Sequence, residues 1–203
     1  MICMNPKHPS RLRQPNQVGF SLIEVMISAV ILVTGLVGVL SVFGLAVAVN
    51  QGAQQDMIAR QVASEAMESI FTARNTSQLS FSQINNVSSG GIFTNAATKL
   101  LSAGPDGLVN TADDVNFAAA APCPAGPECL VLPGKDGILG TSDDVAMSLS
   151  NFTRQIQIGT VLEDDGVTIN PNLKQITVTV TYYTGISHVP QTYTVTGLIS
   201  AFH

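Results

Sequence analysis

An uninterrupted apolar segment from residue 25 to residue 49 constrains this chain more than any other feature. The segment reads VMISAVILVTGLVGVLSVFGLAVAV and contains no charged residue. A helix needs about 20 apolar residues to cross a bilayer, so this segment is long enough. Only 11% of the whole chain is charged, against about 25% in typical soluble domains. We therefore expect part of the chain to face lipid or a large protein interface.

The residues that precede this segment are basic. Lys7, Arg11 and Arg13 lie within the first 19 residues, which contain no acid, and this asymmetry predicts a cytoplasmic N-terminus. A secretory signal peptide is the alternative, because residues 46–48 (Ala-Val-Ala) offer a small-x-small cleavage site. The apolar core of a signal peptide spans only about 7–15 residues, however. The greater length found here favours a membrane-spanning helix.

One carboxylate stands inside the otherwise apolar helix. Glu24 directly precedes the uncharged segment and follows Gly19-Phe20-Ser21-Leu22-Ile23. A charge costs roughly 2.5–3.5 kcal/mol at the middle of a bilayer on insertion scales, and less near the interface. Ionisable residues in such places are therefore candidates for a function, although a glutamate here could also simply extend to the lipid headgroups.

The seven residues GFSLIEV, from Gly19 to Val25, follow a short basic leader and precede a long apolar helix. In this context they resemble the class III signal of type IV prepilins and of type II secretion pseudopilins. The resemblance implies that a prepilin peptidase cuts after Gly19 on the cytoplasmic side and methylates the new first residue, Phe20. It also implies that the apolar helix is retained. Glu24, the fifth residue of the mature chain, would then be the assembly carboxylate.

The chemistry of this spacing is consistent with assembly. Cleavage would leave a positive amine on Phe20, four residues before Glu24. When the apolar helices bundle in a growing filament, the Glu24 carboxylate of one subunit can neutralise the Phe20 amine of a neighbour. Removing one partner of a pair buried in this way costs about 3–5 kcal/mol. We expect the pair to set the register of the filament rather than to add net stability.

The helix is predicted to continue beyond the apolar segment, to about Arg74. Ile58, Val62, Ala66 and Ile70 recur at intervals of four residues and form a stripe on one helix face. Such a stripe indicates burial against a core. We therefore expect a helix over residues 20–74, of which 20–49 span the membrane or form the filament core and 50–74 are amphipathic.

The C-terminal part is predicted to be an antiparallel sheet that the amphipathic half of the helix covers. Residues 152–158, 174–183 and 192–199 alternate between apolar and polar side chains, as half-buried strands do. Residues 163–166 and 170–172 read as turns. The fold class is therefore α+β, a long N-terminal helix on a C-terminal antiparallel sheet, and the resemblance implies the type IV pilin fold. The expected organisation is a cleaved leader (1–19), the helix (20–74), a variable loop region (75–151) and the sheet (152–203).

The body of the chain is acidic. After residue 19 there are six Lys and Arg against 14 Asp and Glu, a net charge of −8. Such a body repels phosphate backbones, so we expect no nucleic-acid partner for it. Catalysis is equally unsupported, because the three histidines (His8, His188 and His203) stand without a Cys/His or Ser/His/Asp context, and the glycine-rich stretches lack a phosphate-loop signature. The chain is not expected to be an enzyme.

A short acidic pattern occurs twice, 30 residues apart. Residues 104–115 read GPDGLVNTADDV and residues 134–145 read GKDGILGTSDDV, with seven identical positions out of 12. Oxygen ligands of this kind suit Ca²⁺, although the spacing is not that of an EF-hand. The pattern resembles Asp-Gly loops of secreted calcium-binding repeats and, more loosely, the calcium loop of the major pseudopilin. Two plain Asp-Gly turns with solvated acids are the alternative. The candidate calcium ligands are Asp106, Asp113, Asp114, Asp136, Asp143 and Asp144.

Two cysteines lie between the two copies of this pattern. Five residues separate Cys123 from Cys129, and Cys3 would leave with the leader. In an exported protein two nearby cysteines indicate a disulfide, which for so small a loop contributes about 2 kcal/mol. A zinc site is disfavoured, because no histidine accompanies the pair.

The resemblance is strongest to a PilV-type minor pilin, on residues 51–55 (QGAQQ), residues 63–70 (ASEAMESI) and the two late strands. It implies a subunit that is anchored in the bacterial inner membrane with its N-terminus in the cytoplasm, and that then primes or enters a surface pilus for adhesion, motility or DNA uptake. The implied partners are membrane lipid, the prepilin peptidase, the inner-membrane assembly platform and other pilins. Two alternatives stay open: a minor pseudopilin of a periplasmic type II secretion pseudopilus, and a membrane-anchored calcium-dependent adhesin that does not polymerise.

Overall fold

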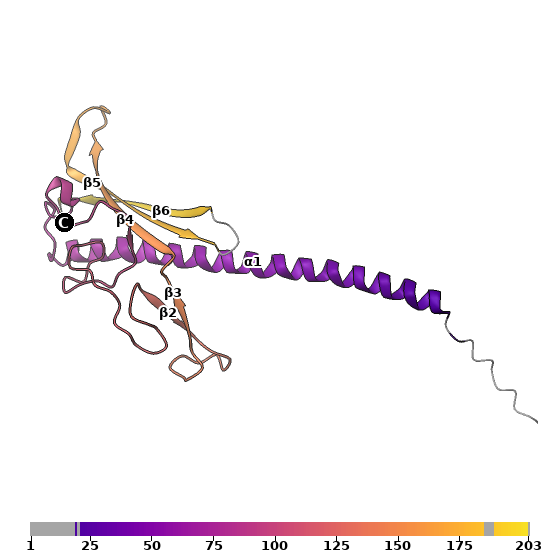
Figure 1. Ribbon diagram of the computed structural model, residues 1–203. Coiled ribbons are helices and arrows are strands. Elements are labelled where there is room, and N and C mark those ends of the chain that lie inside the picture. Colours follow the sequence, from indigo (N-terminus) through magenta and orange to yellow (C-terminus); the bar gives the residue numbers. More distant parts are fainter. Residues whose placement is uncertain (1–18, 20, 185–188, 203) are drawn as a thin grey trace, which may run out of the picture. The chain divides into compact units, whose positions relative to one another are not determined.

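The computed structural model describes Gly19 and residues 21–184 and 189–202. It contains one long helix, α1 (Leu22–Asn75), and the strands of two antiparallel sheets (Figure 1). The chain divides into two compact units, Met1–Ala46 and Val47–His203. The predicted α+β fold class is confirmed, and the arrangement of helix and sheet is consistent with the pilin fold.

In the first unit, the helix is apolar on every side. Its most apolar window has a mean hydropathy of 2.6, and α1 is long and apolar enough to cross a membrane by length and composition. The few hydroxyl groups satisfy themselves within the helix: Thr34 Oγ1 donates to the Val30 carbonyl at 2.9 Å and Ser41 Oγ to the Val37 carbonyl at 2.7 Å. Internal satisfaction of this kind is what a lipid environment requires. The segment therefore places no unpaired hydroxyl from these residues against lipid.

In the second unit, the same helix becomes one-sided. The predicted stripe is buried, with Ala66 and Ile70 fully inaccessible, whereas the flanking Met57 is 70% exposed. Alanines fill the spaces between the larger residues of the buried face and let the sheet approach closely. The approach is close at Gly197, where an added Cβ would meet Met67 Sδ at 3.1 Å.

The main sheet has the strand order β1-β4-β5-β6, and all neighbours are antiparallel. Its strands are β1 (Thr98–Lys99), β4 (Phe152–Leu162), β5 (Ile169–Tyr183) and β6 (Pro190–Ser200). Figure 1 shows β5 and β6 running along the second half of α1. The connecting region contains the 3₁₀ turn η1 (Val87–Ser89) and a separate two-stranded sheet of β2 (Cys129–Leu132) and β3 (Val145–Ser148).

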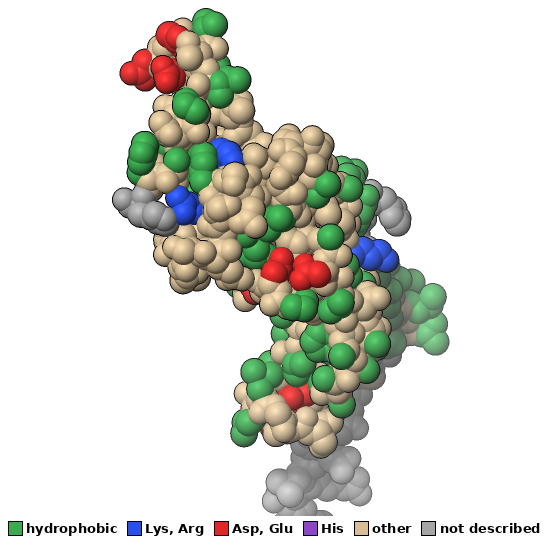
Figure 2. All heavy atoms as spheres, turned by 90° about the vertical axis from the view of Figure 1, so that its left-hand side faces the viewer, with side chains coloured by type: hydrophobic (Ala, Val, Ile, Leu, Met, Phe, Trp, Pro, Cys, Tyr) green, Lys and Arg blue, Asp and Glu red, His purple; other side chains and the backbone are tan. Residues whose placement is uncertain are grey.

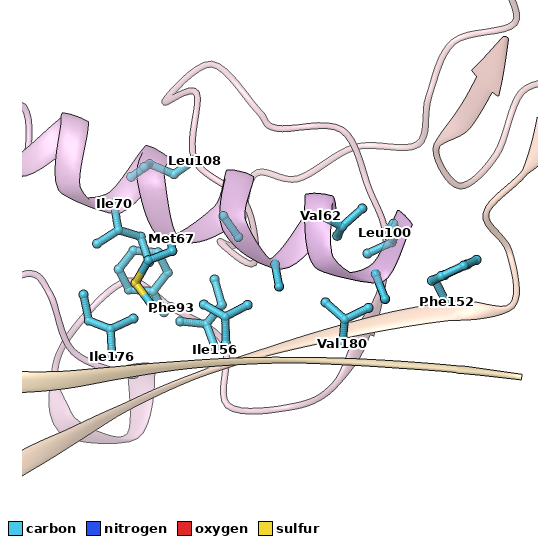
Figure 3. Packing of buried hydrophobic residues seen from close by; sticks show 14 of the residues in the cluster. Val62, Met67, Ile70, Phe93, Leu100, Leu108, Phe152, Ile156, Ile176 and Val180 are labelled. Carbon is cyan, nitrogen blue, oxygen red and sulfur yellow. The ribbon is translucent and has the colours of Figure 1, made fainter. Parts of the chain in front are cut away.

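The core lies between one face of this sheet and the helix. Ile176, Val178 and Val180 of β5 are fully buried, and Ile156 of β4 lies beside them (Figure 3). The alternation predicted for the late strands is therefore confirmed. The connecting region contributes further side chains to the same cluster, among them Phe93, Leu100 and Leu108.

One predicted turn is wrong. Residues 170–172 (Asn-Pro-Asn) belong to β5, which continues beyond them to pair Ile169 with Leu162. The ladder changes register between Thr160 and Val161, and the extra residues on β5 form an irregularity there. Proline is tolerated at such a bulge, because its missing N–H breaks no ladder hydrogen bond. The turn predicted at residues 163–166 is confirmed, and it joins β4 to β5, with acidic side chains at the tip of this hairpin (Figure 2).

Two polar side chains attach the connecting region to the sheet. Asn86 is buried, donates to the Ile156 carbonyl at 2.8 Å and accepts from the Ile158 amide at 2.8 Å, so it acts as a short piece of strand at the edge of β4. Lys174 Nζ donates to the carbonyls of Phe81 and Ile84 at 2.6 and 2.9 Å. Burial lowers the pKa of Lys174.

Candidate functional site

The start of α1 holds the residues that the prepilin resemblance singles out. Glu24 lies in the first turn of the helix, where the positive end of the helix dipole favours a carboxylate. The Ser21 carbonyl accepts hydrogen bonds from the amides of Glu24 and Val25 at 3.0 and 3.2 Å, so the helix starts directly at the motif. Gly19 is exposed. Phe20 and the leader before Gly19 lie outside the described residues.

The duplicated sequence is also a duplicated structure. In the first copy, Ser102 and Val115 pair across the base of a loop, and in the second, Leu132 and Val145 do the same. Each loop therefore connects two antiparallel segments, and the offset of 30 residues holds for both base pairs. Gly107 and Gly137 adopt positive φ angles of 69° and 71°, which glycine takes without strain.

The first two acids of each copy occupy corresponding positions. Asp106 Oδ1 accepts from the Leu108 amide at 2.8 Å, and Asp113 Oδ2 accepts from the Asp106 amide at 3.4 Å. In the second copy Asp136 and Asp143 repeat these two bonds at 2.9 and 3.3 Å. The first acid therefore folds its own turn, and the second acid closes it.

A threonine hydroxyl holds the second acid in each copy. Thr111 Oγ1 donates to Asp113 Oδ1 at 2.7 Å, and Thr141 Oγ1 donates to Asp143 Oδ1 at 2.7 Å. These hydroxyls are the largest cause of the lowered pKa of Asp113 and Asp143, to which backbone amides add. Both acids are therefore held in their ionised form.

The third acid binds the backbone before it in both copies. Asp114 Oδ2 accepts from the Asn110 amide at 2.7 Å, and Asp144 Oδ2 accepts from the Gly140 amide at 2.7 Å. Asp114 is partly buried, and burial raises its pKa against the lowering effect of its hydrogen bonds. Asp144 Oδ1 is a buried oxygen with no hydrogen-bond partner among the described residues.

Glycines at the start of each copy allow this closure. A Cβ at Gly104 would collide with Asp113, and one at Gly134 would collide with Asp143. No role was predicted for these two glycines. Their identity in the two copies is the sequence signal that could have indicated one.

The two loops differ in their surroundings. Leu108 of the first copy is only 2% exposed, whereas its counterpart Ile138 is 60% exposed. The first loop is packed into the core, and the second projects from the sheet of β2 and β3. The same local turn therefore serves two environments.

Asn110 makes this difference. It is 1% exposed, has a φ of 62°, and occupies the place that Gly140 fills in the second copy with a φ of 87°. Its side chain accepts from Arg154 Nε at 2.7 Å and donates to the Arg154 carbonyl and to Thr98 Oγ1, both at 3.0 Å. Asn110 thus fastens the first loop to β4 and β1 of the main sheet.

Arg154 is the buried cation that these bonds surround. The residue is 2% exposed, and this burial lowers the pKa of Arg154. The negative charges of Glu128, Asp114 and Glu65 raise the same pKa and so oppose the effect of burial. Burial also raises the pKa of Glu128. The strand pattern of residues 152–158 indicates the position of Arg154 but not this role. The role follows from its burial and from its long-range contact with Asn110.

The predicted disulfide is present. Cys123 and Cys129 are bonded, with their Cα atoms 5.9 Å apart. The Leu100 carbonyl accepts from the Glu128 amide at 2.8 Å, and the Glu128 carbonyl accepts from the Leu149 amide at 3.0 Å. These two bonds attach the residue before Cys129 to the chain on either side of it. The disulfide therefore closes the segment that joins the two loops.

The acids of each loop are engaged by hydrogen-bond donors of the loop itself. Within residues 19, 21–184 and 189–202, no group of three or more His, Cys, Asp or Glu side chains is placed so that it could hold a metal ion. The carboxylates instead accept hydrogen bonds from amides and hydroxyls. The buried Asp144 Oδ1, which has no partner among the described residues, is the one observation of this kind in the loops that fits a cation.

Comparisons with known proteins add no relative: no family model, curated protein or solved structure matches the chain. The motif at the helix start and the geometry of the loops are therefore the features that bear on function.

A pH titration tests how the second loop holds its acid. We expect the Asp143 carboxyl to titrate below the ordinary aspartate value of about 3.9, and Thr141→Val to move its pKa upward, because the strongest donor is lost. Because the pKa of Asp143 is lowered in the folded state, its ionised carboxylate stabilises the fold above about pH 3.9. This stabilisation is lost as the pH falls through the lowered pKa. The pKa of Asp143 is measured in the wild type and in the variant from the NMR chemical shift of the carboxyl carbon as the pH is changed.

Thr141→Ser is the matched control for this titration, since it keeps the hydroxyl. It should titrate as the wild type does. An unchanged pKa of Asp143 in Thr141→Val would contradict the assignment of the hydroxyl as the main cause.

Proposed function

We propose that the chain is a minor pilin subunit of a type IV pilus, anchored in the bacterial inner membrane with its N-terminus in the cytoplasm and then assembled into the filament or priming it. The observation that carries the proposal is one continuous helix, Leu22–Asn75, which starts at the GFSLIEV motif with Glu24 in its first turn. It is apolar on every side at first and buries a single face later. The apolar half suits a subunit that lies first in lipid and later among neighbouring helices, and the one-sided half attaches the helix to the sheet.

The exposed apolar area of the first unit supports assembly. Large apolar residues of the first unit, such as Leu32, Phe43 and Leu45, are each more than 60% exposed. Outside lipid, an apolar helix of this length must be covered by protein. A bundle of identical or related helices provides such a cover, as the resemblance to pilins implies.

The test of this proposal is the N-terminus of the mature chain. We expect mass spectrometry of the protein, expressed with a prepilin peptidase, to show a chain that begins at Phe20 with a methylated amine. Gly19→Val should block processing, because the peptidase cuts after this glycine in the proteins that the motif resembles. A mature chain that begins at Val49 would indicate a signal peptide and would overturn the proposal.

The second candidate is a minor pseudopilin of a type II secretion system. The duplicated Asp-Gly loops favour it, because they loosely resemble the calcium loop of the major pseudopilin. Deletion of the gene separates the two candidates: loss of surface pili supports the pilin, and loss of secreted enzymes with pili intact supports the pseudopilin. Correct processing without entry into any filament would leave the membrane-anchored adhesin.

We also propose that the two loops bind Ca²⁺. Asp106, Asp113 and Asp114 would supply the oxygens in the first copy, and Asp136, Asp143 and Asp144 in the second. The support is the shared turn, which gathers three acids in each copy, together with the buried Asp144 Oδ1. Arg154 already offsets the charge of Asp114 in the first loop. The second loop is therefore expected to bind the ion more tightly.

Calcium should raise the melting temperature of a soluble fragment that begins at Val47, the start of the second compact unit. An ion that binds only the folded state stabilises it by about 2.7 kcal/mol at a hundred times Kd. The double variant Asp106→Ala/Asp136→Ala should lose most of this shift, and the two single variants separate the loops. Melting with calcium and with chelator measures the effect.

Calorimetric titration provides the independent readout for calcium. Equal melting temperatures in both buffers, together with no heat on titration, would show that the loops are ordinary Asp-Gly turns. Magnesium serves as the matched control ion, because its demand for near-octahedral geometry is poorly met by flexible loops.

A further inference from the structure

The face of the main sheet that points away from α1 presents an ordered grid of uncharged hydrogen-bonding side chains. The register aligns β4, β5 and β6 so that outward residues stand in ranks across the three strands. The three ranks are Thr153–Thr181–Thr192, Gln155–Thr179–Thr194 and Gln157–Thr177–Thr196. Seven of these nine positions are threonine.

The spacing of the grid follows from β geometry. Neighbouring strands lie about 4.8 Å apart, and alternate residues along one strand about 6.8 Å apart. The hydroxyls of Thr179 and Thr194 approach to 3.2 Å. Gln157 and the three threonines of β6 are exposed, and the other five residues are half-buried. Gln155 Nε2 already donates to the Asn95 carbonyl at 2.8 Å, at the β4 side of the grid. The remaining side chains offer a regular set of groups that can donate and accept hydrogen bonds.

The chemistry of the face disfavours charged partners and lipid. None of the nine side chains is charged, so neither a phosphate backbone nor an acidic or basic protein gains an ion pair there. The grid is too polar for a lipid surface. At one end of the same face, Tyr183 is 49% exposed and pairs with Pro190, so an aromatic ring adjoins the hydroxyls. Hydroxyls, amides and an aromatic ring together suit a polymer that is neutral and rich in hydroxyl groups.

We propose that this outer face, formed by β4, β5 and β6, binds a neutral polysaccharide. Sheets twist by about 20–25° per strand, and a flexible polymer chain can follow this twist. Each sugar hydroxyl can exchange hydrogen bonds with the threonines, and the ring of Tyr183 supplies apolar contact to a sugar face. The inference does not depend on whether the subunit polymerises.

The experiment uses the full chain in a zwitterionic detergent without a sugar headgroup, pelleted with microcrystalline cellulose, chitin or starch granules. We expect the wild type to pellet with at least one of them. The triple variant Thr177→Val/Thr179→Val/Thr194→Val keeps side-chain shape and strand preference while removing three hydroxyls. This variant should bind the polymer at least tenfold more weakly, because three hydrogen bonds are lost. Its melting temperature should be unchanged.

Two controls make the result specific. Thr160→Val applies the same change to an exposed threonine of β4 outside the grid and should bind as the wild type does. The triple serine variant at positions 177, 179 and 194 keeps the hydroxyls and should retain binding. The proposal is overturned if the wild type stays in solution with all three polymers, or if the valine variant binds equally well. Pelleting without any polymer that the valine variant abolishes would identify a second copy of the chain as the occupant, and would also overturn it.

Discussion

Asn110→Gly is expected to destabilise the second unit by about 2–6 kcal/mol, because at least two buried groups lose a partner and each costs about 1–3 kcal/mol. Those groups are Arg154 Nε and the Arg154 carbonyl. Glycine keeps the positive φ that this position needs, so the loss reports the side chain and not backbone strain. Unfolding in urea measures the change on the fragment from Val47 onward. Against a total stability of about 5–15 kcal/mol, the effect is large.

The second loop supplies the matched control for this variant. Gly140→Asn places asparagine at the corresponding position, where the φ of 87° is one that asparagine tolerates better than most residues. No buried arginine meets a side chain in this exposed part of the loop, so the change in stability should stay within about 0.5 kcal/mol. Equal losses in the two variants would show that the turn, rather than the contact with Arg154, determines stability.

Glu24→Ala is expected to leave the chain processed and inserted in the membrane while reducing its entry into filaments by a hundredfold or more. The reason is the pair proposed between the Glu24 carboxylate and the Phe20 amine of a neighbouring subunit. Breaking such a buried pair costs about 3–5 kcal/mol, and about 1.4 kcal/mol corresponds to a factor of ten. The membrane and sheared-filament fractions are compared by immunoblot.

Glu24→Gln refines this experiment, because the amide keeps the size and hydrogen-bonding capacity of the side chain but not its charge. It should also fail to assemble if charge neutralisation is the mechanism. Glu68→Gln, in the exposed part of the amphipathic half, is the matched control and should assemble normally. Normal assembly of Glu24→Ala would reduce Glu24 to a side chain that extends to the headgroups.

Local sequence patterns predicted most of the fold. The stripe of Ile58, Val62, Ala66 and Ile70 gave the buried helix face, and the alternation from Ile176 to Tyr182 gave the buried face of β5. Both patterns repeat with the period of their element, so they depend on no distant contact. The turn predicted at residues 170–172 was wrong because asparagine and proline favour turns locally, whereas pairing with β4 keeps this segment in the strand.

The candidate loops were predictable as turns but not in their roles. The identical Asp and Gly positions indicated one repeated device, and the structure folds both copies alike. The distinction between them depends on a partner 44 residues away, since Arg154 meets Asn110 and has no counterpart at Gly140. One local signal existed: asparagine and glycine, which exchange at this position, are the two residues that most readily adopt a positive φ. No pattern in the sequence indicated the buried partner.

The projecting second loop has a practical consequence for following this subunit in cells. Residues 138–140 are exposed, the turn is closed by its own carboxylates, and the loop is tied to the rest of the chain through the short sheet of β2 and β3. Exposed loop tips of this kind tolerate inserted sequence. An epitope or a small fluorophore-binding tag placed between Leu139 and Gly140 would leave both the helix and the core untouched. It would mark where the subunit resides, from membrane insertion to any filament it enters.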